Sequence, residues 1–173
     1  MPRTRQRWLI DIERVLTLLL IAATCWLAME SRWLASDWRK TSREQIGVQT
    51  WLALEARWDS NDMKAGRREL ASKLSAEFKH GDISDQVMEF FESVGSAYNL
   101  GLINKDLAIS SFGYALRYWD AAEKYVQDER RRQGGDPSYY DQWEEFAKVL
   151  RKREQPITEE KLKNFLADES SKN

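Results

Sequence analysis

The stretch that decides the architecture reads VLTLLLIAATCWLAM, residues 15–29, and it contains no charged side chain. As a helix it would be about 22 Å long, and extension to Leu34 brings it to about 30 Å, the thickness of a bilayer's hydrocarbon core. The extension takes in Glu30 and Arg32 near one end, where long side chains reach the lipid headgroups. We therefore predict a single transmembrane helix over residues 15–34.

Two alternatives to this anchor stay open. A cleaved signal peptide also has a charged start, here MPRTRQR, before an apolar run of this length, although no good A-x-A cleavage site follows the run. A buried core helix is the other alternative, because apolar runs this short also occur in protein cores.

Basic residues flank the apolar run equally, so the positive-inside rule does not orient it. They are Arg3, Arg5, Arg7 and Arg14 before the run and Arg32, Arg39, Lys40 and Arg43 after it. We expect a single-pass protein of the cell (inner) membrane. The rest of the chain is expected on the cytoplasmic side, because it contains none of the disulfide bonds that are typical of proteins in oxidising compartments. Thr24 and Ala28 form a small-xxx-small pair, which suggests a homodimer through the membrane helix; simple contact of these residues with lipid is the alternative.

Composition excludes several classes of protein. The 173 residues include 8 Gly, 3 Pro, one Cys and one His, which excludes a turn-rich β-sandwich, a disulfide scaffold and a Cys-based zinc cluster. A net charge of −1 gives no reason to expect a nucleic-acid partner. The chain has no nucleophile elbow and no phosphate-binding glycine loop, so we expect no enzyme activity, no cofactor and no metal site.

Beyond the apolar run, apolar residues recur at helical spacing and no strand pattern is present. The stripes are Trp51, Leu54 and Trp58; Met63, Leu70, Leu74 and Phe78; Val87, Phe90, Phe91, Val94 and Tyr98; Ile109, Phe112, Leu116, Trp119 and Val126; Tyr139, Trp143, Phe146 and Leu150; and Leu162, Phe165 and Leu166. The predicted fold class is all-α, an N-terminal transmembrane helix followed by a compact bundle of about five helices.

Local signals predict where these helices begin and end. Predicted caps are Ser84, Asn104, Asp136 with Pro137 at the first helical position, and Thr158; Gly101 suits a left-handed helix end. One long helix is predicted from Asn104 to Gln133, with Gly113 inside it. The predicted organisation is a basic tail (1–14), a transmembrane helix (15–34), a juxtamembrane connector (35–45), an α-helical domain (46–168) and a frayed tail (169–173). Residues 31–45 are either a hinge or a continuation of the membrane helix.

Two sets of charged residues are candidate sites. Glu92 follows an aromatic pair and Arg117 lies between core positions, so we predict an ion pair between them across two packed helices. The alternative is that both side chains are simply exposed to solvent. The second set is two basic clusters that suit contact with anionic lipid headgroups or a phosphate-bearing ligand. These clusters are Arg130, Arg131 and Arg132, and Lys148, Arg151, Lys152 and Arg153. The alternative for the arginine triplet is simple pairing of cations with a helix C-terminus.

Three ordered pieces of the chain carry a resemblance. They are WLALEARWDSNDMKAGRREL (51–70), VMEFFESVGSAYNLGLI (87–103) and SFGYALRYWDAAEKYVQDERRRQGGDPSYYDQWEEF (111–146). Together they resemble a family of small bacterial proteins catalogued only as a domain of unknown function. The resemblance implies one N-terminal membrane helix and an α-helical domain, and it implies no activity, cofactor or catalytic residue.

The function that these observations favour is non-enzymatic binding or scaffolding at the membrane, with membrane lipid and an unidentified protein as partners. One alternative is a ligand-sensing regulatory module with a pocket lined by Tyr118, Trp119 and Trp143. The other is a secreted helical domain released by cleavage of a signal peptide.

Overall fold

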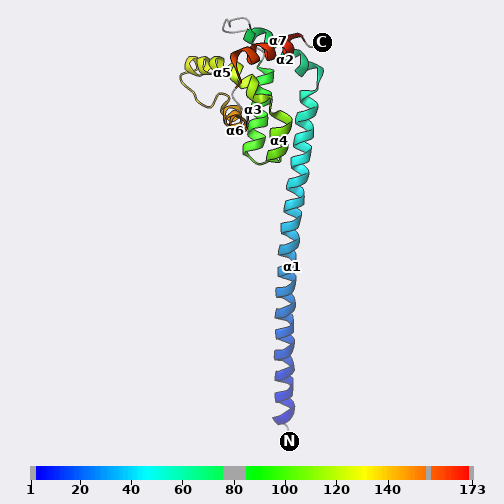
Figure 1. Cartoon of the computed structure of the whole chain (residues 1–173). Coiled ribbons are helices and arrows are strands. Elements are labelled where there is room, and N and C mark those ends of the chain that lie inside the picture. Colours follow the sequence, from blue (N-terminus) through cyan, green and yellow to red (C-terminus); the bar gives the residue numbers. More distant parts are fainter. Residues whose placement is uncertain (1–2, 76–84, 155–156, 172–173) are drawn as a thin grey trace. The chain divides into compact units, whose positions relative to one another are not determined.

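The computed structural model describes residues 3–75, 85–154 and 157–171, and these residues form seven α-helices and no strand (Figure 1). The helices are α1 (Arg3–Trp58), α2 (Asn61–Ser75), α3 (Gln86–Asn99), α4 (Lys105–Phe112), α5 (Ala115–Arg132), α6 (Asp141–Arg151) and α7 (Glu159–Ser171). The predicted all-α fold is confirmed.

The chain divides into two compact units, residues 1–45 and 46–173. Helix α1 supplies the helical part of the first unit and continues into the second, to which it contributes residues 46–58. Residues 31–45, predicted as either a hinge or a helix, are helical throughout. Within its described residues the second unit contains six complete helices besides the end of α1, more than the predicted five or so.

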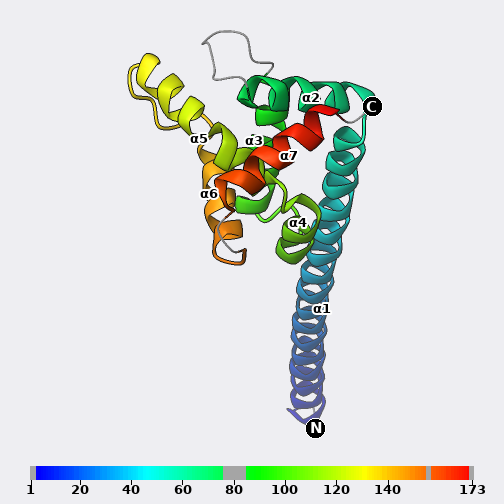
Figure 2. The same cartoon turned by 45° about the horizontal axis from the view of Figure 1, so that its top comes forward.

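Two helix pairs account for most of the packing in the second unit. Helix α3 packs along α6, and α2 packs along α7. The two views agree that α7 runs beside α2 (Figures 1 and 2). Helix α3 also contacts α2 and α4, while α5 contacts α6 and α7. Helix α3 therefore lies between most of the other elements, which explains why it is the most thoroughly buried helix of the unit.

The core of the second unit is mainly aromatic, and Phe91 on α3 is at its centre. The Phe91 ring centroid lies 5.4 Å from that of Trp58, 5.3 Å from Tyr118 and 5.2 Å from Trp143. These rings come from four different helices, α3, α1, α5 and α6. Full burial of one large apolar side chain contributes about 1.5 to 3 kcal/mol, so this cluster is a main source of stability.

Two predicted helix starts and one predicted helix end are confirmed. The Asn104 side chain accepts hydrogen bonds from the backbone N–H groups of Asp106 and Leu107, each at 3.0 Å, and so caps α4. Thr158 caps α7 through its hydroxyl oxygen. Gly101 has φ +65°, the left-handed conformation that glycine adopts without strain after a helix.

The predicted long helix from Asn104 to Gln133 is wrong, because it is two helices. Helix α4 ends at Phe112 and α5 begins at Ala115, with Gly113 and Tyr114 in a turn between them. Glycine weakens a helix interior by about 1 kcal/mol, which lowers the cost of a break there. The turn places the Tyr114 ring in a stack on Trp58, with centroids 4.3 Å apart.

Helix α6 begins later than predicted. Asp136 and Pro137 were expected to open it, yet α6 starts at Asp141. The Asp136 carboxylate instead accepts a hydrogen bond from the backbone N–H of Ser138 at 2.9 Å, which closes a local turn. Tyr140, the residue before α6, is in the left-handed region with φ +58°.

The C-terminal end is ordered further than predicted. Residues 169–173 were expected to fray, but α7 continues to Ser171, and Glu169 is only 8 % exposed. The predicted cap Ser84 and the predicted apolar position Phe78 lie outside the described residues.

Candidate functional site

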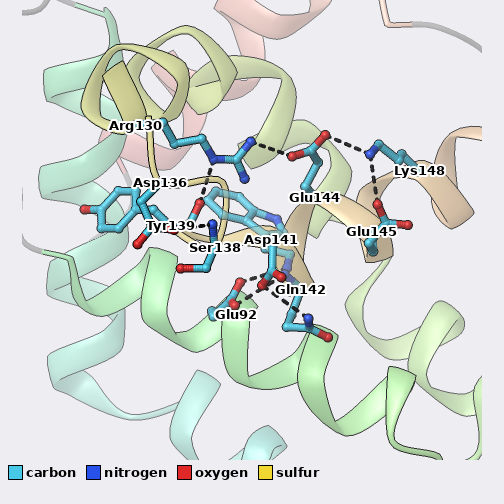
Figure 3. A network of polar contacts seen from close by, with 11 residues as sticks. Glu92, Arg130, Asp136, Ser138, Tyr139, Asp141, Gln142, Glu144, Glu145 and Lys148 are labelled. Atoms are coloured by element: carbon cyan, nitrogen blue, oxygen red, sulfur yellow. Dashed lines mark hydrogen bonds and ion pairs between the residues drawn. The ribbon is translucent and has the colours of Figure 1, made fainter. Parts of the chain in front are cut away.

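The crossing of α3 and α6 is built around Glu92, whose carboxylate lies at the first turn of α6 (Figure 3). The backbone N–H of Trp143 donates to Glu92 Oε2 at 2.9 Å, and that of Gln142 donates to Oε1 at 3.3 Å. The first N–H groups of a helix lack acceptors within it, and its positive dipole end favours a carboxylate. Glu92 on α3 therefore caps α6, whose own N-cap residue, Tyr140, makes no side-chain cap.

Burial is the largest influence on the Glu92 carboxylate, and it raises the pKa of this group above its ordinary value. The two backbone hydrogen bonds from α6 act in the opposite direction, because they favour the charged form. The nearby carboxylate of Asp141 adds to the increase. Glu92 is thus a half-buried glutamate whose carboxyl group has a structural role at the start of α6.

Gly95 allows α3 and α6 to approach at this crossing. A Cβ atom at position 95 would lie 2.2 Å from the carbonyl oxygen of Gln142 and 2.9 Å from the backbone nitrogen of Trp143. Both contacts are with backbone atoms, so neither can be relieved by a side-chain rotation. The absence of a side chain at Gly95 and the acceptor at Glu92, one turn earlier, together set the α3–α6 distance.

The structure does not bring Glu92 and Arg117 together. Glu92 is used at the start of α6, whereas the Arg117 guanidinium lies over the Phe165 ring, 5.7 Å from its centroid. Within the described residues no ion pair joins the two. The predicted pair fails because Arg117, although it stands between buried residues in the sequence, is exposed on α5 and faces α7.

Arg130 joins the end of α5 to the start of α6 (Figure 3). Its Nε donates to the carbonyl oxygen of Tyr139 at 2.9 Å and its Nη1 to Glu144 at 2.7 Å. Lys148 donates to both Glu144, at 2.8 Å, and Glu145, at 2.9 Å. Arg130 is only 9 % exposed, so it is unsuited to the lipid contact predicted for it.

Glu144 differs from Glu92 in the balance of influences on its carboxylate. Burial alone would raise its pKa, but hydrogen bonds from Lys148 and Arg130, together with their positive charges, hold the pKa below its ordinary value. The Glu144 carboxylate is therefore stabilised by cations, whereas the carboxyl group of Glu92 is held by backbone N–H groups.

The other members of the predicted basic clusters are mostly paired with carboxylates of the same unit. Arg131 pairs with Asp128 and Arg132 with Glu129, each one helical turn away. Arg151 reaches Asp120 on α5 at 2.5 Å. Arg153 forms an exposed ion pair with Asp106, with 3.4 Å between Nη2 and Oδ1. Lys152 is exposed. The clusters therefore carry much less unbalanced charge than the sequence suggests.

A buried polar contact ties α7 to the rest of the unit, and the sequence analysis missed it. The Tyr118 hydroxyl donates to Glu169 Oε2 at 2.7 Å, and Arg67 Nε lies 3.8 Å from the same oxygen. The Arg67 guanidinium also lies over Trp58, 4.1 Å from the ring centroid. One signal could have found it: Glu169 continues the Leu162, Phe165 and Leu166 stripe at the next helical position.

One cleft lies between α5 and α7, with a volume of about 400 Å³. In the described part of the chain it is lined by Leu116, Arg117, Asp120, Glu154, Ile157, Lys161, Asn164, Phe165 and Asp168. The three rings predicted to line a pocket, Tyr118, Trp119 and Trp143, are instead fully buried in the core. The predicted aromatic pocket is therefore wrong.

Metal binding has no support among the described residues, where no group of three or more His, Cys, Asp or Glu side chains is placed to hold an ion. His80, the single histidine of the sequence, lies outside them.

The apolar run of α1 is exposed along its length. Within the described residues, Leu16–Trp58 is the one helical stretch whose length and composition suit a membrane span, and its apolar window is not buried. Side chains on all sides of the helix are exposed; those of Leu16, Leu18, Leu19, Leu20, Ile21, Trp26, Leu27, Met29, Trp33 and Leu34 are examples. A core helix would bury at least one face, so exposure all round disfavours that alternative.

A family model described as a domain of unknown function, DUF4760, matches residues 14–152. The chain belongs to this family. No curated protein and no solved structure matches the chain. The predicted resemblance to a family without a known function is thus confirmed.

The DUF4760 match begins just before the apolar run and ends just after α6. The apolar run is therefore part of the matched domain. Helix α7 lies beyond the matched residues, although Glu169 on α7 receives the buried hydrogen bond from Tyr118 inside them. In this member of the DUF4760 family, α7 completes the helical unit.

Proposed function

We propose that the protein is anchored by one membrane-spanning helix and holds its helical unit at the membrane surface as a non-enzymatic binding or scaffolding module. The observation that carries this proposal is the exposure of the apolar run, residues 16–34, on every side of α1. In water such a surface would be costly, at about 25 cal/mol for each Å² of apolar area. Lipid is the partner that covers a whole helix circumference.

Length also supports an anchor. Residues 16–34 rise about 28 Å as a helix, close to the roughly 30 Å hydrocarbon core of a bilayer. The charged residues Glu30 and Arg32 come near the end of this stretch, where they reach the headgroup region. The start of the family match at residue 14 is a further support, because it treats the apolar run as part of the domain.

The use of charged residues inside the helical unit supports a role without catalysis. Glu92 caps α6, Arg130 joins α5 to α6, and Glu169 fastens α7. Each of these charged groups is engaged in joining two helices, and Arg130 and Glu169 are buried. We propose that the unit serves as a rigid platform, and that a protein partner binds its surface.

Homodimerisation through the membrane helix remains part of the proposal. Thr24 and Ala28 are both exposed on α1, and the Thr24 hydroxyl donates to the carbonyl oxygen of Ile21 at 2.9 Å. Because that hydroxyl is satisfied within its own helix, it can lie in an apolar interface without an orphaned donor.

The test is protease accessibility of the full-length protein with a C-terminal tag, in intact and in lysed spheroplasts, followed by carbonate washing of the membranes. A protected tag on protein that stays in the washed membrane is expected for an anchored protein with a cytoplasmic helical unit. A digested tag on retained protein would keep the anchor and place the unit on the other side. Tagged protein that is shorter than the full chain and leaves the membrane on washing would replace the anchor with a cleaved signal peptide.

A further inference from the structure

The cleft between α5 and α7 has the size and walls of a small-molecule site. Its volume of about 400 Å³ falls in the range of ligand pockets, roughly 300 to 1,000 Å³. It lies wholly within residues 46–173, so inferences about it do not depend on membrane anchoring.

Three apolar side chains line the cleft, and Phe165 among them is held in place by its neighbours. Leu116 is buried, and Ile157 and Phe165 are half-buried. The Phe165 ring packs edge-on against Tyr118, with centroids 5.1 Å apart, and Tyr118 is itself held by Glu169. A hydrocarbon group in the cleft would therefore rest on a preformed surface and remove apolar area from water.

Two cations that line the cleft form no ion pair with any carboxylate that the structure describes. Among the described residues, neither Arg117 on α5 nor Lys161 on α7 forms an ion pair, whereas the Asp120 carboxylate is held by Arg151. The Arg117 guanidinium lies over Phe165, 5.7 Å from the ring centroid, so this cation stands next to an apolar side chain of the cleft. A guanidinium binds a carboxylate through two parallel hydrogen bonds, and a lysine adds a second positive charge.

Acidic groups limit the charge that the cleft accepts. Glu154 also lines it, and its negative charge opposes a dianion or a phosphate ester. A single carboxylate attached to a compact apolar group suits a cleft lined by two cations, three apolar side chains and additional acidic groups. We infer that this cleft binds a small organic monocarboxylate, with its carboxylate on Arg117 and Lys161 and its hydrocarbon part on Leu116, Ile157 and Phe165.

The experiment titrates 3-phenylpropionate into the full-length protein in nanodiscs of neutral lipid, by calorimetry, with empty nanodiscs as the blank. Saturable binding is expected. Arg117→Met keeps much of the side-chain length and removes the charge, and it should weaken binding at least tenfold. Lys161→Met should weaken binding severalfold. Lys124→Met removes a cation from an exposed position of α5 outside the cleft, and it should leave the affinity within twofold.

Three results would overturn the inference. The first is absence of saturable binding. The second is an affinity unchanged by both Arg117→Met and Lys161→Met, each shown to be folded by its thermal melt. The third is equal or tighter binding of phenethylamine, which has the same ring and a positive charge in place of the carboxylate. Arg117 and Lys161 are both exposed, and each is changed in a separate variant. If one variant fails to fold, the other still tests the inference.

Discussion

The apolar run of α1 and the aromatic core around Phe91 are both built from large apolar side chains, and they are opposite in exposure. Trp38, a few residues past the run, is 72 % exposed, whereas Trp143 in the core is 0 % exposed. Tryptophan occurs in both regions, although the run is mainly aliphatic and the core mainly aromatic. The difference is that each core ring meets rings from other helices, whereas the large apolar side chains of residues 16–34 are exposed. Composition measures how strongly a segment avoids water, and tertiary contacts decide whether protein or lipid replaces the water.

The largest expected effect is on the association of the apolar run with the membrane. Leu19→Lys combined with Ile21→Lys places two charges in the apolar run, and each central lysine opposes insertion by about 2.5 to 3.5 kcal/mol. The protein should leave carbonate-washed membranes while its helical unit keeps its thermal melt. The control is Leu100→Lys, at an exposed leucine outside the run, which should leave membrane retention unchanged. Retention of the double variant would contradict a spanning helix.

The second-largest expected effect is on the stability of the aromatic core. Trp143→Ala removes a fully buried ring and its N–H hydrogen bond to the carbonyl oxygen of Ala115, which is 3.1 Å long. The expected loss in free energy of unfolding is about 3 to 5 kcal/mol. Urea unfolding followed by near-ultraviolet circular dichroism measures it. Trp38→Ala makes the same truncation at an exposed position and should change stability by less than about 0.5 kcal/mol. Similar losses in both variants would mean that Trp38 is buried by an unrecognised contact.

A smaller effect tests the helix crossing beneath the core. Gly95→Ala forces a Cβ against the α6 backbone, and overpacking of this kind costs roughly 1 to 3 kcal/mol. Gly66→Ala is the matched control, because its Cβ would first meet the flexible side chain of Gln86, at 3.2 Å. Alanine is also favoured over glycine inside a helix, so Gly66→Ala should be neutral or slightly stabilising. Equal melting temperatures for the two variants would disprove the close approach at Gly95.

The smallest effect separates the two acids at the start of α6 by the pH dependence of stability. The pKa of Glu144 is lowered from 4.5, so its contribution is complete above that pH and is lost as pH falls through the lower, folded-state pKa. Glu144→Gln should therefore cost about 1 kcal/mol at pH 7 and less in acid. The pKa of Glu92 is raised from 4.5, so the wild type loses stability as pH rises from 4.5 through the raised pKa. Glu92→Gln removes this loss, and its cost relative to wild type should be larger at acid pH than at pH 7. Denaturant titrations at several pH values give both slopes, and slopes of the same sign would refute the assignment.

Some features of the fold could be predicted from the sequence because they depend on neighbours in the chain. The Asn104 cap requires only the next few backbone N–H groups, and the left-handed Gly101 requires only its own lack of a side chain. Helical stripes such as that of Phe90, Phe91 and Val94 likewise follow from the 3.6-residue period.

Other features depended on distant residues and were missed or misassigned. The break between α4 and α5 is linked to the stack of Tyr114 on Trp58, 56 positions earlier in the chain. Glu92 was predicted to pair with Arg117, because an isolated acid in a core stripe suggests a basic partner. In the structure its carboxylate oxygens instead accept hydrogen bonds from backbone N–H groups of α6. Backbone partners carry no signature in a sequence, since every residue other than proline has the same N–H group.

The sequence by itself determined the helical class, the apolar run, its charged flanks and the membership of an uncharacterised family, because each depends on composition or periodicity along the chain. Only the tertiary structure decided that Glu92 caps α6, that Arg130 is buried, that Glu169 fastens the last helix and that Arg117 faces a cleft with Lys161. These depend on which helix faces lie together in space. That arrangement follows from the combined packing of the aromatic rings and from close approaches such as the one at Gly95, and no single segment of the chain contains it.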